Sequence, residues 1–273
     1  MVQRSRSLHS TAVGRADLEA AVCYALRRRG IRCAPVRHHG ALIPRTQGGR
    51  ETLYELLKRY SFRLFLRDLI RFKQGAMVDQ LTHYCCADAV RQFVEVLSRI
   101  GVISVLRNGQ VRLSDQTVHS FGPTLEWFVA EALLRELGIA TAWGLRPVGT
   151  PAGGDYDVIG LADGALIYVE VKSSAPRNIE QRQIRAFVER LGTLAPDVAI
   201  LLNDTQLRML DKLVPALRSE LRHRPFATGA IRRVQGEIFS RGDRLFVTNS
   251  EPDLIGNVGV CLARFFRTRG RQP

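Results

Sequence analysis

Two neighbouring apolar runs in the second half of the chain carry the side chains best suited to catalysis. Asp157 opens the first run, Glu170 and Lys172 close the second, and Asp163-Gly164 between them is a favoured two-residue hairpin turn. With these two residues at the centre of the turn, the hairpin register places Asp157 opposite Glu170, and Asp155 opposite Lys172. The same register pairs Val158 with Val169 and Ala162 with Ala165.

The register predicts a metal site on one face of the hairpin. Side chains alternate along a strand, so Asp155, Asp157, Glu170 and Lys172 share a face, opposite the valines. Opposed carboxylates have Cβ atoms about 5 Å apart and repel each other unless something compensates. Mg²⁺ or Mn²⁺ prefers such oxygen ligands, and Lys172 beside it could position or help deprotonate a water molecule. The alternatives are a metal-free salt-bridge ladder, and Asp155 as the ligand in place of Asp157; we favour Asp157 because it opposes Glu170.

An amphipathic helix precedes the hairpin and supplies a further candidate ligand. Gly122-Pro123-Thr124 is typical of a helix start, and apolar positions continue through Leu137. Glu126 borders the apolar stripe, so we expect it to reach inward and complete the metal shell; its alternative role is that of a first-turn acid favoured by the helix dipole. Glu131 and Arg135, one turn apart, are expected to form a solvent-exposed pair.

In order, Glu126, Asp157 and Glu170-Val171-Lys172 match the pattern of the PD-(D/E)xK nuclease superfamily, and residues 121–204 resemble it. The local sequences Gly-Pro-Thr-Leu-Glu, Asp-Val-Ile and Val-Glu-Val-Lys are similar to those of archaeal Holliday-junction resolvases and CRISPR-ancillary nucleases of this fold. The resemblance implies a restriction endonuclease-like core, a mixed sheet flanked by helices, and Mg²⁺- or Mn²⁺-dependent hydrolysis of phosphodiester bonds. No proline precedes Asp157, in departure from the pattern. Gln183 resembles the glutamine of one nuclease branch, or is a plain solvated side chain.

The remaining C-terminal segments predict a layered α/β structure. We expect a helix after Pro176, a buried strand at residues 198–202 and a helix around residues 207–221. Strands near residues 238–239 and 245–247 and a terminal helix near residues 254–266 follow. We therefore assign residues 119–273 to the nuclease-like domain.

Residues 51–118 resemble a mainly α winged-helix domain. Helical periodicity is followed by Gly101 and by two short alternating runs around Asn108-Gly109, a strong hairpin signal. In that family the third helix enters the major groove. The nucleic-acid contacts that the resemblance implies are Arg91, Gln92 and Arg99, with Arg107 on the wing. Protein contact or a spacer role is the alternative.

Charge and composition favour a polyanionic partner. The formal net charge is +14, which raises the local concentration of phosphate groups, although an arginine-rich composition alone could produce it. Residues 1–50 are interpreted as a basic arm with one helix from about Ala16 to Arg29, followed by a linker. Its expected phosphate contacts are Arg27, Arg28, Arg29, Arg32 and Arg37. Five cysteines without a CxxC pair, and the absence of a signal-like apolar stretch, indicate reduced thiols and a cytoplasmic location.

These observations predict a Mg²⁺- or Mn²⁺-dependent nuclease, with DNA favoured over RNA as substrate, no membrane partner, and homodimers by analogy with the fold. A role in defence or DNA repair follows from the resemblance. The alternative is a DNA-binding regulator that keeps the nuclease fold without catalysis. An effector-gated defence nuclease is disfavoured, because no Rossmann-like sensor precedes Glu51.

Overall fold

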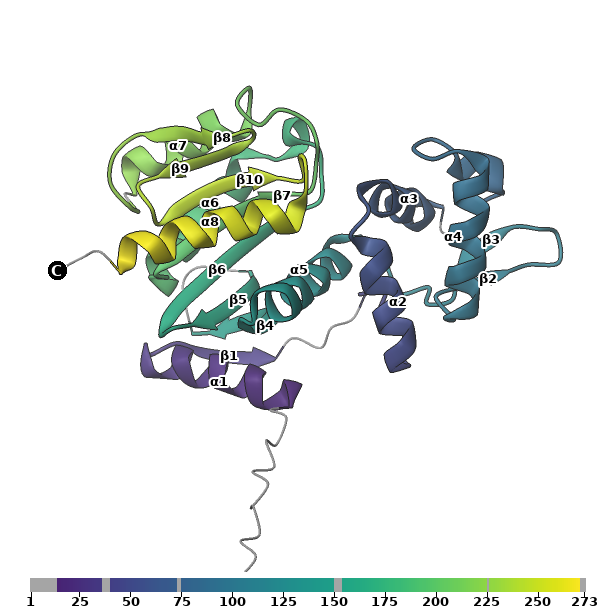
Figure 1. Cartoon of the computed structure of the whole chain (residues 1–273), viewed down its shortest axis with the longest axis horizontal. Helices are drawn as coiled ribbons and strands as arrows, with labels where there is room; N and C mark the ends of the chain where they lie inside the picture. Colours follow the sequence, from purple (N-terminus) through teal and green to yellow (C-terminus); the bar gives the residue numbers. More distant parts are fainter. Residues whose placement is uncertain (1–13, 36–39, 73–74, 150–153, 225, 271–273) are drawn as a thin grey trace, which may run out of the picture.

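The computed structural model describes residues 14–35, 40–72, 75–149, 154–224 and 226–270. An eight-stranded mixed sheet forms its largest part, with the strand order β1-β4-β5-β6-β7-β10-β9-β8 (Figure 1). The strands are β1 Arg32–Pro35, β4 Ala140–Val148, β5 Tyr156–Ala162, β6 Ala165–Lys172, β7 Val198–Asn203, β8 Ile231–Gln235, β9 Ile238–Arg241 and β10 Leu245–Asn249. The pairs β6–β7 and β7–β10 are parallel, and the other neighbours are antiparallel. The expectation of a mixed sheet is therefore confirmed.

Helices cover both faces of this sheet. Helices α5 (Gly122–Leu137) and α8 (Leu254–Arg269) contribute to the core on one face. Helices α1 (Arg15–Arg28), α6 (Gln181–Leu194) and α7 (Leu213–His223) contribute to the core on the other. None of the described helices is both long and apolar enough to cross a membrane.

The turn between β5 and β6 has the expected register. Asp163 (φ 49°) and Gly164 (φ 70°) both lie in the left-handed region that a type I′ hairpin turn requires. Val158 pairs with Val169, and Ala162 pairs with Ala165, as predicted. The turn chemistry therefore sets which side chains share a face of the hairpin.

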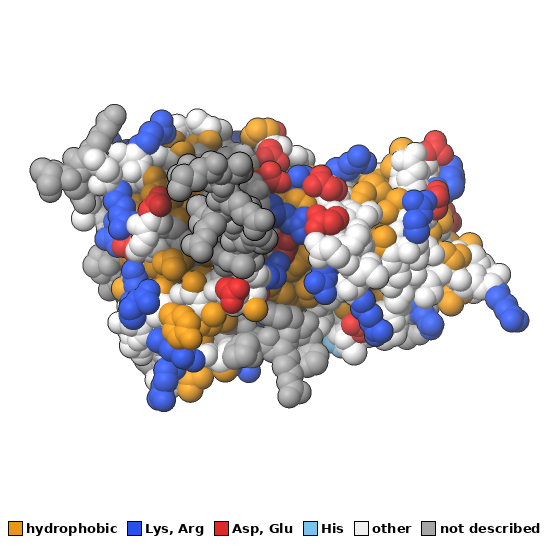
Figure 2. All heavy atoms as spheres, turned by 60° about the horizontal axis from the view of Figure 1, so that its bottom comes forward, with side chains coloured by type: hydrophobic (Ala, Val, Ile, Leu, Met, Phe, Trp, Pro, Cys, Tyr) orange, Lys and Arg blue, Asp and Glu red, His pale blue; other side chains and the backbone are white. Residues whose placement is uncertain are grey.

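Basic side chains are distributed over the surface. Figure 2 shows Lys and Arg on both the sheet part and the helical part of one face, with Asp and Glu among them. Several arginines are compensated locally, as in the pairs Arg91–Asp88 (2.5 Å) and Arg99–Glu95 (2.7 Å). On this face the excess positive charge is spread out.

Residues 47–113 form helices followed by a hairpin, in the expected order. The elements are α2 Gln47–Leu57, α3 Tyr60–Arg71, the 3-10 helix η1 Val78–Leu81, α4 Ala87–Arg99, β2 Ile103–Val105 and β3 Val111–Leu113. An isolated bridge between Ala76 and Val111 adds a third chain segment to the hairpin. Assignment of this part to the winged-helix class stays a prediction.

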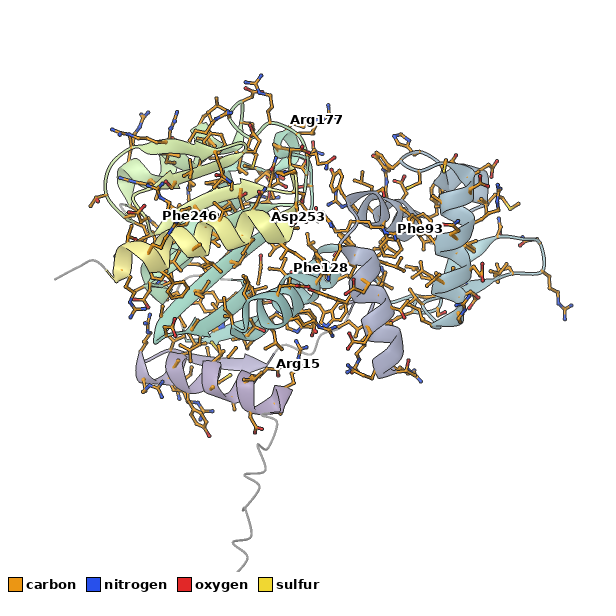
Figure 3. The ribbon with its side chains drawn as sticks, in the orientation of Figure 1. Arg15, Phe93, Phe128, Arg177, Phe246 and Asp253 are labelled. Carbon is orange, nitrogen blue, oxygen red and sulfur yellow. The ribbon has the colours of Figure 1, made fainter. Side chains whose placement is uncertain are left out.

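The helical part shares one core with α5. The ring centroids of Phe62 and Phe93 lie 4.9 Å apart, and those of Tyr54 and Phe128 lie 5.5 Å apart. Figure 3 shows Phe93 within the helical part and Phe128 on α5, between that part and the sheet. Because its apolar side chains pack against both the sheet and the helical part, α5 is buried over much of its circumference.

Three strands were not anticipated from the sequence. Strand β4 contains Gly144 and Pro147, which weaken the sequence signal of a strand, and β1 pairs with it through Arg32–Val148. Helix α1 packs against β4 and β5, so residues 15–35 belong to the sheet layer. The expected contact residue Arg37 lies outside the described residues, and the proposed division at residues 50 and 118 stays a prediction. Strand β8 was also missed, and α7 begins later than expected.

The expectation of a solvent-exposed Glu131–Arg135 pair was wrong. The pair forms, with Arg135 Nε 2.6 Å from Glu131 Oε2, but the Glu131 side chain is only 3% exposed. Arg15 of α1 also contacts Glu131. The two arginine side chains, one from the same helix and one from a distant segment, lie against this carboxylate.

A buried ion-pair cluster connects α3 to the sheet. Asp204, directly after β7, has Oδ1 3.0 Å from Arg63 Nε, and its carboxylate also accepts from Arg67 and from Ser250. The backbone N–H of Asp204 donates to the carbonyl of Lys172 (2.7 Å). The cluster therefore joins the helical part to the end of the strand that carries Glu170 and Lys172.

Replacing Asp204 by alanine should lower the free energy of unfolding by about 3–5 kcal/mol, because Arg63 would be left buried without its counter-ion. The matched control is Asp88→Ala, which removes an exposed acid from an ion pair and should cost about 0.5 kcal/mol or less. Urea unfolding of both variants measures the difference. Equal, small effects would show that the cluster does not hold the two parts together.

Candidate active site

The sequence-predicted residues meet at one edge of the sheet. Strands β5 and β6 are antiparallel, so the start of β5, with Asp157, lies beside the end of β6, with Glu170 and Lys172. Continuing the observed register by one residue past Val158–Val169 sets Asp157 opposite Glu170. Glu126, in the second turn of α5, is close enough for its charge to interact with Glu170 and Lys172.

Glu170 is fully buried and is held by two cations. Its Oε1 lies 2.7 Å from Lys172 Nζ and 2.5 Å from Arg190 Nη2, and the hydroxyl of Tyr168 donates to its Oε2. Burial alone would raise the pKa of Glu170, but the charges of Lys172 and Arg190 lower it below its ordinary value. This carboxylate is therefore ionised and fixed in place.

Among the residues that the structure describes, none forms an ion pair with Asp157. Its Oδ2 accepts a hydrogen bond from the backbone N–H of Val171 (2.7 Å). Burial, followed by the charges of Glu170 and Glu126, raises the pKa of Asp157 well above its ordinary value. Burial and the neighbouring carboxylates both disfavour the ionised form of this side chain.

Glu126 behaves in the same way. Burial, and after it the negative charge of Glu170, raises its pKa to about 7, whereas Lys172 acts in the opposite direction. Burial alone would lower the pKa of Lys172, but the adjacent Glu170 carboxylate raises it above its ordinary value. Lys172 and Arg190 are thus the two cations of a cluster that contains three acids, Glu126, Asp157 and Glu170.

The donor chemistry of this cluster fits a divalent cation. Carboxylate oxygens are the ligands that Mg²⁺ and Mn²⁺ prefer, and a cation would relieve the repulsion that helps to raise the pKa of Asp157 and of Glu126. The geometry is not that of a preformed cage. In the described part of the chain, no three His, Cys, Asp or Glu side chains are grouped closely enough to hold a metal ion. Here Glu170 is bonded to Lys172 and Arg190 instead.

The rival residues have other partners. Arg146 on β4 binds Asp155 in a bidentate manner, with Nε–Oδ1 2.8 Å and Nη2–Oδ2 3.3 Å. The side chain of Gln183 accepts a hydrogen bond from the backbone N–H of Glu180 and caps the start of α6. These contacts favour Asp157 over Asp155 and give Gln183 a structural role.

Sequence reasoning missed Tyr168 and Arg190. A signal for each was present: Tyr168 is two residues before Glu170 and so shares its face of β6. Arg190 is three residues after the buried Phe187 and therefore falls on the inward face of α6, where an unpaired charge is costly. A buried arginine at such a position predicts an acidic partner on the sheet.

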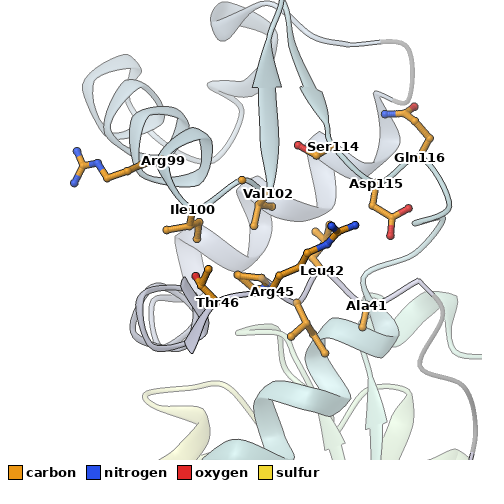
Figure 4. Close-up of a pocket in the computed structure, with 13 residues that line it drawn as sticks. Ala41, Leu42, Arg45, Thr46, Arg99, Ile100, Val102, Ser114, Asp115 and Gln116 are labelled. Carbon is orange, nitrogen blue, oxygen red and sulfur yellow. The ribbon is translucent and has the colours of Figure 1, made fainter. Parts of the chain in front are cut away.

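A separate hollow of about 860 Å³ lies in the helical part of the molecule. Figure 4 shows Arg45 and Asp115 pointing into it, with Leu42, Ile100 and Val102 on its walls. None of the three site acids lines this hollow. It therefore belongs to a different surface.

The raised pKa of Glu126 predicts a pH-dependent stability of the cation-free protein. Because the native state keeps protons that the unfolded chain has released, the free energy of unfolding should fall as the pH rises from about 5 to about 8. Glu126→Gln should reduce this slope, since the amide has no proton to lose. Glu95→Gln, which removes an acid from an exposed ion pair, is the control and should keep the wild-type slope. Thermal melts in EDTA across this range test the expectation, and an unchanged slope in Glu126→Gln would contradict it.

No protein-family model matches the chain, and no curated protein matches its sequence significantly. Among solved structures, protein VC1899 from Vibrio cholerae is similar, with a TM-score of 0.53 and 13% identity over 90% of this chain. A structure of Can2 from Sulfobacillus thermosulfidooxidans in complex with cyclic tetra-adenylate has a TM-score of 0.45 and 10% identity over 89% of this chain. The chain covers 61% of the first protein and 60% of the second. The similarity to VC1899 concerns the fold alone.

Proposed function

We propose that this protein is a metal-dependent nuclease that hydrolyses phosphodiester bonds. The observation that carries the proposal is the crowding of Asp157 and Glu126 beside the Glu170–Lys172 pair, where burial and the neighbouring carboxylates raise the pKa of both acids. Buried acids whose pKa values are raised by a specific neighbouring charge are candidates for a functional site.

In this proposal Asp157 and Glu170 hold Mg²⁺ or Mn²⁺, and Glu126 completes the shell. When bound, the cation would act as a Lewis acid on a phosphoryl oxygen and lower the pKa of a bound water molecule. Lys172, whose ammonium is anchored by Glu170 at 2.7 Å, would orient the attacking water or neutralise charge that develops on the phosphate. The raised pKa of Lys172 favours the second role, because an ammonium that holds its proton is a poor base.

The helical part is proposed to be a winged-helix module that contacts DNA. Of its candidate contact residues, Arg91 is paired with Asp88 and Arg99 with Glu95, so their charges are partly neutralised on α4. Gln92 and Arg107 are exposed, and Arg107 lies in the β2–β3 turn. We therefore place the strongest phosphate contact at the turn. DNA as the preferred substrate and homodimer formation belong to this proposal as well.

A non-catalytic DNA-binding protein is the second candidate function. The contact between Arg190 and Glu170 favours it, because a guanidinium at 2.5 Å from Oε1 occupies a carboxylate that the enzyme would need. Cleavage assays on plasmid, single-stranded and branched DNA, with EDTA, Mg²⁺ or Mn²⁺, separate the two functions.

Asp157→Ala should reduce metal-dependent cleavage by about a thousandfold or more, because the cation loses a ligand while the DNA-binding surface is unchanged. Asp155→Ala is the matched control: it removes a carboxylate two residues away on the same chain segment, and that carboxylate is bound to Arg146. The control should keep most of the activity. Cleavage that survives in Asp157→Ala would reject the proposed enzyme. Loss of cleavage in both variants would show that substitutions in this segment disturb its structure, so that the loss in Asp157→Ala could not be assigned to a missing metal ligand.

Arg107→Ala should weaken DNA binding at every sequence and lower the slope of log affinity against log salt by about one. Arg91→Ala should have a smaller effect, since Asp88 already compensates that guanidinium. Fluorescence anisotropy in EDTA at several salt concentrations measures both slopes. Equal slopes for Arg107→Ala and the wild type would remove the turn from the DNA-binding surface.

A further inference from the structure

Arg190 on α6 is a buried cation inside the acidic cluster. Its side chain is 8% exposed, its Nη2 lies 2.5 Å from Glu170 Oε1, and its Nε donates to the Tyr168 hydroxyl at 2.9 Å. A Cβ at Gly154 would lie 3.0 Å from its Nη1, so the guanidinium packs closely against the chain just before β5. These contacts fix Arg190 in one arrangement.

The cluster is neutralised unevenly. Glu170 bonds to Lys172 and Arg190 through one oxygen and to Tyr168 through the other, whereas Asp157 accepts a bond from the neutral backbone N–H of Val171. The burial of Glu170 is affordable only because cations are beside it. Arg190 therefore neutralises the charge of Glu170, as a bound divalent cation would neutralise the charge of the whole cluster.

An orienting role would not require a full positive charge. Side chains that orient a metal ligand commonly donate a hydrogen bond from a neutral group or lend negative charge, which strengthens the ligand. A guanidinium bonded to the ligand oxygen weakens metal binding instead, because it occupies the lone pairs that the metal needs and its positive charge repels the metal cation. Removing the charge should therefore change metal affinity in opposite directions under the two roles.

We propose that Arg190 is a positioning residue that holds Glu170 in the cation-free protein and competes with the divalent cation for its carboxylate. The inference rests on the proposed function, because it takes Asp157 and Glu170 as the ligands. Cation binding then transfers Glu170 from Arg190 to the metal, and the protein keeps a neutralised interior in both states.

The test compares the wild type with Arg190→Met, which keeps most of the side-chain volume and removes the charge. Mn²⁺ binding by titration calorimetry should be tighter in Arg190→Met by about tenfold or more, and Mn²⁺ should raise its melting temperature by more than it raises that of the wild type. An orienting residue predicts the opposite sign, a loss of about 10- to 100-fold in affinity. Arg190→Lys, which retains a cation, should stay near the wild-type affinity. Unchanged or weaker binding in Arg190→Met would overturn the proposal.

Folding of the variant is controlled separately. An Arg190→Met protein that folds only with Mn²⁺ supports the proposal, because the cation then replaces the missing charge. If Arg190→Met folds neither with nor without Mn²⁺, the Tyr168→Phe variant is measured instead, because it removes the hydroxyl that links Arg190 to Glu170. Tighter Mn²⁺ binding by Tyr168→Phe than by the wild type supports the proposal. Unchanged or weaker binding overturns it.

Asp157→Asn separates this inference from the proposed function. If the wild type binds Mn²⁺ and Asp157→Asn does not, the metal site is supported. The Arg190→Met result alone then tests whether Arg190 competes with the metal for Glu170. If neither the wild type nor Arg190→Met binds Mn²⁺, both the metal site and the competition are rejected.

Discussion

Repulsion between carboxylates on facing strands is the constraint on which the rest of the site depends. The turn at Asp163-Gly164 fixes the register, and the register brings Asp157 and Glu170 to the same edge. Two ionised acids so close in a partly buried place cannot coexist without a cation. Lys172 and Arg190 lower the pKa of Glu170, whereas burial and the neighbouring acids raise the pKa of Asp157. The surroundings therefore shift the pKa values of two chemically similar groups in opposite directions.

The same edge is tied to the helical part of the molecule. Asp204 bonds to Arg63 and Arg67 of α3, and its backbone N–H donates to the carbonyl of Lys172. The ion pairs of Asp204 with α3 and its backbone hydrogen bond to Lys172 therefore link the site to α3. Under the proposed function, a movement of α3 on binding nucleic acid would act on Lys172 through Asp204.

The sequence was sufficient for the parts of the site that depend on local chemistry. Turn residues with positive φ gave the register of β5 and β6, and continuing that register sets Asp157 opposite Glu170. It was insufficient where the partner comes from a distant segment. The pairing of β1 with β4, the contact of Arg15 with Glu131, and the contact of Arg190 with Glu170 all join residues that are far apart in the chain. Neither periodicity nor spacing encodes such contacts, although a charge on the inward face of α6 indicates that a partner must exist.

Arg190 also bears on which of the two candidate functions the cluster serves. A scaffold that had lost catalysis would gain stability by neutralising every acid, and the simplest course would be to replace Asp157 and Glu126 by neutral residues. Instead the chain contains both acids, and burial and neighbouring carboxylates raise their pKa values, which is a cost to the stability of the cation-free protein at neutral pH. Under the proposed function, a divalent cation would remove this cost, and the contacts of Glu170 with Lys172 and Arg190 would let the protein fold before the cation binds.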